Sequence, residues 1–166
     1  EVCRILVDDG RFPLAWVAKP DAETAALRVV ASAGNAGNFF AMAHHPDAPT
    51  TQAMRTVEPV AVRNLLTREG SAWVAGAVHR GFGAALALPL SPDWRAIGVL
   101  TLYARDLDAF DADEVAMFTE LADSLTYGLE TIAARRDRDH QQSELLTARR
   151  QTALALQENC EELHTA

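Results

Sequence analysis

Cysteine is almost absent from this sequence of 166 residues. The two that occur, Cys3 and Cys160, stand at opposite ends of the chain and form no C-x-x-C pair. This placement argues against a disulfide framework, a cysteine-based zinc site and a redox pair. Long apolar runs are also missing, because the longest uncharged apolar stretch, residues 84–90, is far too short to span a bilayer. We expect a cytoplasmic domain held by an ordinary hydrophobic core, without a metal site or a membrane segment.

Basic charge is scarce, and the known catalytic motifs are missing. The chain carries 15 basic and 23 acidic residues, a net charge of −8, and Lys19 is its one lysine. Without a concentrated basic stripe, nucleic-acid binding is not expected. No glycine-rich phosphate loop occurs, the serines lack a nucleophile-elbow context, and paired acids occur only where helix capping explains them. The sequence predicts a protein that is not an enzyme.

The first two thirds of the chain alternate between short apolar runs and turn signals. Two hairpins are predicted, one from strands at 13–19 and 26–33 around Pro20-Asp21, the other from strands at 82–90 and 95–104. Spacings of three and four before Pro13 predict the end of a helix. Between the hairpins lies an irregular crossover, residues 34–81, with short helices at 50–57 and 71–80 and a short strand at 59–62. Ser71 is the expected N-cap of the second helix and Gly81 its stop.

Both faces of the predicted five-stranded sheet are apolar. Strand parity separates Leu86 and Leu88 from Ala85 and Ala87, and neither set is polar. An antiparallel sheet with one face in water would alternate apolar and polar residues, so this sheet needs cover on both faces. The predicted fold class is α/β (α+β), an α/β/α sandwich with a largely antiparallel central sheet, helices on one face and the crossover on the other.

The last third predicts one long helix. Asp111 is its expected cap, and apolar residues then keep helical spacing at Val115, Phe118, Leu121, Ala122, Leu125, Leu129 and Ile132. Neither proline nor glycine interrupts residues 129–166, so a helix of about fifty residues, roughly 75 Å long, is expected. The apolar seam breaks at 136–143 and resumes in a shifted register. A helix of that length needs a partner, and the expected dimer and relay positions are Leu125, Leu129, Ile132, Leu145, Leu156 and Leu163.

The order of these elements and several residue runs resemble the GAF family of bacterial sensor domains. The resemblance is carried by Gly81-Phe82, the runs at 87–90 and 97–103, Phe110-Asp111 with Asp113-Glu114, and Leu121-Ala122. Such domains precede cyclic-di-GMP enzymes, histidine kinases or PAS domains. The resemblance implies a GAF/PAS-like sensor domain at 1–132, followed at 133–166 by a helical linker. This linker is expected to be a coiled coil that leads as a parallel homodimer to a covalently linked output domain.

The resemblance also implies a pocket between the sheet and the crossover, though not its ligand. The pocket candidates are the aromatic residues and one turn residue in segments that line it: Phe39, Phe40, Asn64, Trp73, Phe82 and Tyr103. Apolar cavities with few polar groups are the usual small-molecule sites. The family's covalent bilin attachment and its methionine sulfoxide reductase activity both need cysteines that the pocket region lacks, and the cofactor stays unassigned.

Three hypotheses for the function remain open from the sequence. The first is a sensory domain that binds a small ligand or partner and relays the signal through the C-terminal helix. The second is a structural dimerisation spacer whose pocket is filled by its own side chains. The third is a haem-binding gas or redox sensor, with His44, His45 or His79 as ligand to the iron.

Overall fold

The computed structural model describes residues 1–8, 11–21, 23–24, 26–35 and 37–165, and their side chains except those of 43 and 153–165. The chain forms two compact units, Glu1–Tyr127 and Gly128–Ala166. Its elements in order are α1 (Val2–Asp8), β1 (Leu14–Pro20), β2 (Leu27–Gly34), the 3₁₀ helix η1 (Gly37–His44), α2 (Pro49–Thr56), β3 (Val60–Val62), the 3₁₀ turn η2 (Leu65–Thr67), α3 (Ala72–His79), β4 (Ala84–Leu90), β5 (Gly98–Ala104) and α4 (Ala112–Thr165). The predicted hairpins, crossover helices and long helix are confirmed.

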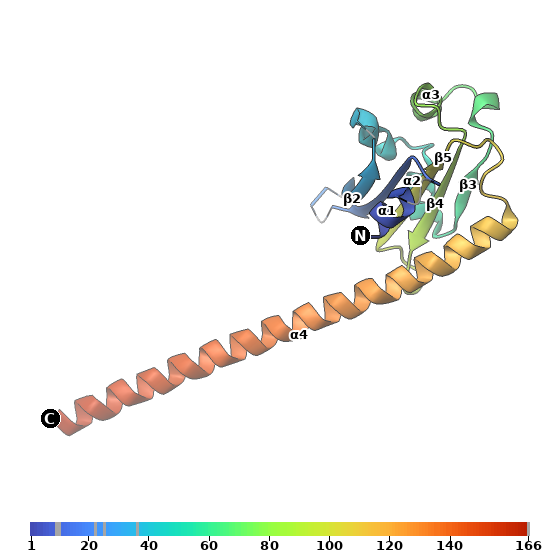
Figure 1. Cartoon of the computed structure of the whole chain (residues 1–166). Coiled ribbons are helices and arrows are strands. Elements are labelled where there is room, and N and C mark those ends of the chain that lie inside the picture. Colours follow the sequence, from blue (N-terminus) through green and yellow to red (C-terminus); the bar gives the residue numbers. More distant parts are fainter. Residues whose placement is uncertain (9–10, 22, 25, 36, 166) are drawn as a thin grey trace. The chain divides into compact units, whose positions relative to one another are not determined.

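The first unit is built on a five-stranded antiparallel sheet in the order β2-β1-β5-β4-β3 (Figure 1). The two hairpins therefore meet at the sheet centre, where Leu14 pairs with Tyr103 and Trp16 with Thr101. All seven residues of β5 are buried. β5 begins at Gly98, three residues later than the expected start, because Asp93 and Trp94 prolong the turn and the first bond across it joins the Ile97 N–H to the Leu90 carbonyl, at 2.8 Å.

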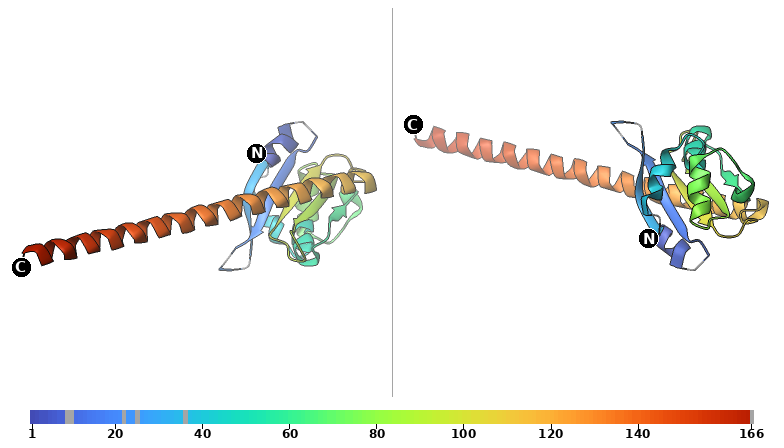
Figure 2. Two further views of the ribbon diagram at one scale, coloured as in Figure 1. Left: turned by 90° about the horizontal axis from the view of Figure 1, so that it is seen from below. Right: turned by 90° about the horizontal axis from the view of Figure 1, so that it is seen from above.

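The two faces of the sheet have different cover, as the sequence predicted. Leu14, Trp16 and Tyr103 share one face and belong to a core cluster with residues of η1, η2 and α3. On the opposite face, Leu88 lies near Thr119 and Ala122 in the first part of α4. The two views of Figure 2 show the crossover elements on one side of the sheet and this part of α4 on the other. The α/β/α sandwich is confirmed.

Helix α3 ends in a Schellman motif. The Gly81 N–H donates to the Val78 carbonyl at 2.9 Å, and the Phe82 N–H donates to the Ala77 carbonyl at 3.1 Å. Gly81 adopts the left-handed conformation, with φ of 74°. The expectation that Gly81 stops the helix is confirmed, and the motif directs Phe82 into the core, where it is 4% exposed.

The expectation that Ser71 caps α3 is correct in position and wrong in chemistry. Ser71 is the N-cap residue with extended backbone angles, yet its side chain makes no capping hydrogen bond. Its Oγ atom is buried without a hydrogen-bond partner among the described residues. A hydroxyl in that state costs free energy, so something other than helix capping accounts for its orientation.

The start of α4 is held by two hydrogen bonds between side chains and backbone and by three phenylalanine rings. Asp111 Oδ1 accepts the Glu114 N–H at 2.9 Å, while Glu114 Oε2 accepts the Phe110 N–H at 2.7 Å. The rings of Phe12, Phe110 and Phe118 contact one another at centroid distances of 5.4 to 6.3 Å. Asp111 is thus confirmed as the cap, and the three phenylalanine rings connect the first turns of α4 to the residues before β1.

A buried pair of hydroxyls provides a first test of this packing. Thr50 in α2 and Thr101 in β5 are both 0% exposed, and their Oγ1 atoms lie 2.9 Å apart. We expect Thr101→Val to lower the free energy of unfolding by about 1–3 kcal/mol, because it leaves the Thr50 hydroxyl without this partner. The double variant Thr50→Val/Thr101→Val should recover part of that loss. Urea denaturation of Thr50→Val, Thr101→Val and the double variant measures the coupling, and strictly additive losses would contradict the pairing.

Candidate functional site

Five aromatic rings fill the space between the sheet and the crossover. Trp16 of β1 lies at the centre, with ring centroids 5.9 Å from Phe39, 5.5 Å from Phe40 and 5.1 Å from Tyr103. Phe39 and Tyr103 also contact Phe82, at 5.8 and 5.0 Å. The elements that supply these rings are η1 and the strands β1 and β5, together with Phe82 between α3 and β4. We call this group the aromatic cluster.

The aromatic cluster contains a buried donor without an acceptor. Trp16 is 0% exposed, and its indole Nε1 has no hydrogen-bond partner among the described residues. Indole N–H groups in protein interiors usually find an acceptor, and leaving one unpaired costs about 1–3 kcal/mol. The cluster therefore has an unused directional contact for a molecule that brings an acceptor. Tyr103 adds a second polar group, and burial raises the pKa of its hydroxyl above the ordinary range, so it stays neutral.

A cavity of about 360 Å³ lies beside the aromatic cluster. It is lined by Asp47, Gln52, Val62, Arg68, Glu69, Gly70, Ser71, Trp73 and Val74. Trp73 and Val74 line this cavity and also belong to the same core cluster as Trp16, so they connect the cavity lining to the core that contains the rings. The unpaired Ser71 Oγ belongs to a residue of the cavity wall. The apolar part of the lining is Val62, Trp73 and Val74, and the rest is mostly polar or charged.

The structure brings five of the six predicted pocket residues into one core. Phe39, Phe82 and Tyr103 are buried in the aromatic cluster, Phe40 packs on it half-buried, and Trp73 joins the same core. Whether any of them contacts a ligand stays a prediction.

Asn64 lies apart from the rings, where the structure gives it a turn role. Its backbone is left-handed, with φ of 48°, and its N–H donates to the Leu107 carbonyl at 2.9 Å. Its own carbonyl accepts the hydroxyl of Thr67 at 3.0 Å. The bond to Leu107 joins the end of β3 to the loop after β5, and the bond from Thr67 holds the turn η2. The contacts described for Asn64 thus fit the turn-forming role that the sequence allowed.

Sequence reasoning left Trp16 and Ser71 out of the site. Trp16 was available from strand parity, since it alternates with Leu14 and Ala18, and pairing with β5 then places it on the Tyr103 face. No such signal was available for Ser71, because the hydroxyl of an N-cap serine normally accepts a hydrogen bond from a backbone N–H of the helix. Only the three-dimensional structure shows that this one does not.

The three candidate haem or metal ligands do not converge in the structure. His44 and His79 are exposed, and the half-buried His45 accepts the Asp47 N–H at its Nδ1 atom, at 3.3 Å. In the part of the chain that the structure describes, no group of three histidine, cysteine, aspartate or glutamate side chains is placed to hold a metal ion. The same part contains no helix long and apolar enough to cross a membrane.

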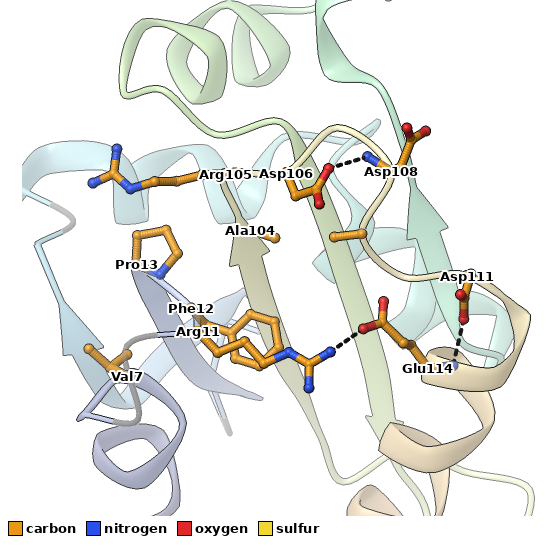
Figure 3. A pocket seen from close by; sticks show the side chains of 11 residues that line it. Val7, Arg11, Phe12, Pro13, Ala104, Arg105, Asp106, Asp108, Asp111 and Glu114 are labelled. Carbon is orange, nitrogen blue, oxygen red and sulfur yellow. Dashed lines mark hydrogen bonds and ion pairs between the residues drawn. The ribbon is translucent and has the colours of Figure 1, made fainter.

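A larger cavity, of about 660 Å³, lies where α1, the start of β1, the end of β5 and the start of α4 meet (Figure 3). Arg11 forms an ion pair with Glu114 across it, so Glu114 both accepts the Phe110 N–H at the start of α4 and contacts the chain before β1. The nearby thiol of Cys3 is buried in α1, and burial raises its pKa. Thiolate chemistry is therefore disfavoured at this cysteine.

The expected dimer positions become more exposed along α4. Leu125 and Leu129 are half-buried, whereas Ile132 is 51% and Leu145 is 65% exposed. Leu146, which the sequence reasoning did not select, is 60% exposed. The side chains of Leu156 and Leu163 lie outside the described residues. Large apolar side chains in this number on one helix are typical of a surface that a partner covers.

The comparisons with known proteins agree with this architecture. A family model described as GAF domain matches residues 1–130. No curated protein matches the sequence.

Three solved structures illustrate the likeness. The GAF domain region of a protein described as a membrane protein, from Geobacter sulfurreducens PCA, has a TM-score of 0.66 at 16% identity and covers 78% of this chain and 89% of its own. A domain of a two-component sensor histidine kinase protein from Sinorhizobium meliloti 1021 has a TM-score of 0.60 at 24% identity, with coverage of 76% and 84%. Free methionine-R-sulfoxide reductase from Neisseria meningitidis has a TM-score of 0.62 at 20% identity, with coverage of 78% and 74%. At these identities the likenesses show the fold.

Proposed function

Because this chain belongs to the GAF domain family, whose members are sensory and regulatory domains of signalling proteins, we propose that it binds a small ligand between its sheet and its crossover. The ligand we propose is planar and largely apolar and carries a hydrogen-bond acceptor, such as a carbonyl oxygen or a ring nitrogen. The observation that carries this proposal is the fully buried Trp16 Nε1 without a partner. In this proposal the ligand enters through the adjoining cavity, whose lining includes Ser71.

Binding requires the rings to move, since the aromatic cluster fills the space between sheet and crossover. η1 is the element that gives way in this proposal. It supplies Phe39 and Phe40, and the Cβ-less Gly76 of α3 lets Phe39 approach closely, 3.3 Å from where a Cβ would stand. Displacing Phe40, which is already half-buried, leaves room beside Trp16. A ligand can shift this equilibrium only by its preference for the opened state.

The relay we propose runs from the sheet to α4. Phe12 leads into β1, the strand of Trp16, and contacts Phe110 and Phe118 at the start of α4, while Arg11 pairs with Glu114. A change in the position of β1 therefore reaches the first turns of α4 through both contacts. We place the sensor domain at 1–132 and a helical linker at 133–166, which as a parallel homodimer leads to an output domain in the cytoplasm.

A structural spacer is the second candidate, and one observation favours it: the protein's own rings fill the space between the sheet and the crossover. A spacer, however, gains nothing from a buried indole N–H without a partner, where phenylalanine would pack at less cost. Catalysis of the sulfoxide reductase type is the least favoured, because the buried Cys3 in α1 is not one of the pocket-lining residues.

Thermal shift measurements test the ligand proposal. Wild-type chain is screened against cyclic nucleotides, nucleobases, quinones and aromatic carboxylates, and we expect at least one class to raise Tm by several degrees. Trp16→Phe keeps an aromatic ring but removes the donor, and should weaken binding of that compound about 10-fold. The matched control, Trp94→Phe, changes a side chain that is 84% exposed and should leave binding unchanged. Equal weakening by both variants, or stabilisation by no compound, would favour the spacer.

A further inference from the structure

A second, smaller cavity has the character of an anion site. It has a volume of about 270 Å³ and is lined by Pro13, Asn35, Gly37, Arg80, Phe82 and Arg105. Two of its six lining residues are arginines and none is acidic, although the chain as a whole carries a net charge of −8. Two cations gathered without a lining carboxylate, on an acidic protein, favour a bound anion over solvent exposure as the reason for the arrangement.

Arg80 is fixed in this cavity without being neutralised. It follows α3 at the Schellman turn, and its guanidinium donates to the Gly76 carbonyl at 3.1 Å and to Asn38 Oδ1 at 2.7 Å. It also lies 4.9 Å from the centroid of the Phe39 ring. These partners are all neutral, and no carboxylate pairs with Arg80 among the described residues. The guanidinium is pre-oriented and keeps its positive charge.

Arg105 completes the site from the end of β5. Figure 3 shows its side chain extending past Pro13, away from the carboxylates of Asp106 and Asp108. Its Nη1 atom lies 3.5 Å from where a Cβ on Gly81 would stand, which places the guanidinium over the turn that carries Arg80. Among the described residues no hydrogen bond or ion pair holds it. All five of its N–H donors are therefore available to a ligand.

From this geometry we infer that the cavity between Arg80 and Arg105 binds a small oxyanion, a phosphate or carboxylate group. Guanidinium groups recognise both through paired N–H donors, and a volume of about 270 Å³ admits such a group with a short substituent. The Asn35 side chain, also part of the wall, can supply a neutral hydrogen bond. A Cβ on Gly37, the first residue of η1, would stand 3.9 Å from Arg80 Nη2. Because glycine has no side chain, nothing crowds the guanidinium at this position.

The site goes beyond the ligand proposed for the aromatic cluster, and the two are connected through one contact. Phe39 lies under the Arg80 guanidinium and also contacts Trp16. An anion that draws Arg80 toward Arg105 weakens the cation–π contact with Phe39, and so alters the ring that covers Trp16. The oxyanion is thus expected to regulate the main pocket as well as to occupy its own cavity.

Calorimetric titration of the full chain tests the inference, with inorganic phosphate, malonate and chloride as probes. We expect phosphate or malonate to bind, and chloride to compete only weakly. Phosphate alone would identify a phosphate ester as the ligand class, malonate alone a carboxylate, and binding of both an oxyanion site without further discrimination. Arg105→Gln should weaken binding about 10-fold, since it removes a charged partner that makes no other contact.

An arginine away from the cavity provides the control. Arg28→Gln removes one positive charge from an exposed position of β2, opposite Lys19 in the hairpin and away from the cavity, and should change affinity less than twofold. Arg80→Gln should weaken binding as much as Arg105→Gln and also change Trp fluorescence through Phe39. Equal effects of Arg105→Gln and Arg28→Gln, or no binding of either oxyanion at about 10 mM, would overturn the inference. Neither result depends on the effect of Trp16→Phe. A failure of the oxyanion site can therefore be distinguished from a failure of the ligand site proposed at the aromatic cluster.

Discussion

Gly34→Ala is expected to destabilise the first unit more than any other single methyl addition at a left-handed glycine. Gly34 ends β2 with φ of +90°, and a Cβ there would stand 2.2 Å from the Pro13 carbonyl oxygen and 3.0 Å from the Leu14 Cα. Both atoms belong to the backbone at the start of β1, which is paired to β2 on one side and β5 on the other. The strand cannot shift without breaking those ladders.

The matched control is Gly70→Ala. Gly70 has nearly the same φ, +89°, but nothing lies within 4 Å of its Cβ position. This variant should lower the free energy of unfolding only by the cost of the left-handed conformation, about 1–2 kcal/mol. Gly34→Ala adds a backbone clash and should lose about 3–5 kcal/mol in total, which lowers Tm by roughly 10 °C or more. Denaturant titration measures both, and equal losses for the two variants would contradict the packing described for β1.

Removing residues 134–166 is expected to convert a dimer into a monomer. We propose that the partner of α4 is a second copy of the chain, because Ile132, Leu145 and Leu146 are all at least half exposed in the single chain. Burying a leucine contributes about 1.5–3 kcal/mol. A dimer that buries Leu145 and Leu146 from both copies should therefore show a dissociation constant at least 100-fold lower than the truncated chain.

Point substitutions distinguish the loss of the apolar interface from the shortening of the helix. Leu145→Glu/Leu146→Glu keeps the helix intact but places charge in the proposed interface, and should give the same loss as truncation. Gln151→Glu adds a charge on the opposite face of the helix without removing apolar area, and is the control. Analytical ultracentrifugation at matched concentration gives the dissociation constants. A dimer that survives truncation would move the interface into residues 1–133.

The sequence predicted the fold well because its signals were local. Turn residues such as Pro20-Asp21 and Gly81, strand parity in 82–90 and 95–104, and the Asp111 cap each specify backbone geometry within a few residues. η1 was missed, since Gly37–His44 has no 3.6-residue period and a 3₁₀ helix offers no comparable signal.

The candidate site was predicted only in part, because its main features are properties of several segments together. Aromatic content identified Phe39, Trp73 and Tyr103, and the structure places them in one core. That Trp16 Nε1 lacks an acceptor, or that Arg80 and Arg105 meet, depends on pairings more than 20 residues apart. No spacing rule carries such information. The histidines drew attention by residue type, and among the described residues they belong to no group of three metal-ligating side chains.

The indole resonance of Trp16 in a ¹H–¹⁵N correlation spectrum tests the central claim most directly. The chain has three tryptophans, and Trp16→Phe assigns the signal. We predict an Hε1 position typical of an unpaired indole in the free protein, and a downfield shift when a stabilising ligand is added, while the exposed Trp94 signal stays in place. A Trp16 signal that is already hydrogen-bonded in the free protein, or that stays fixed with every stabilising compound, would contradict the proposed ligand site.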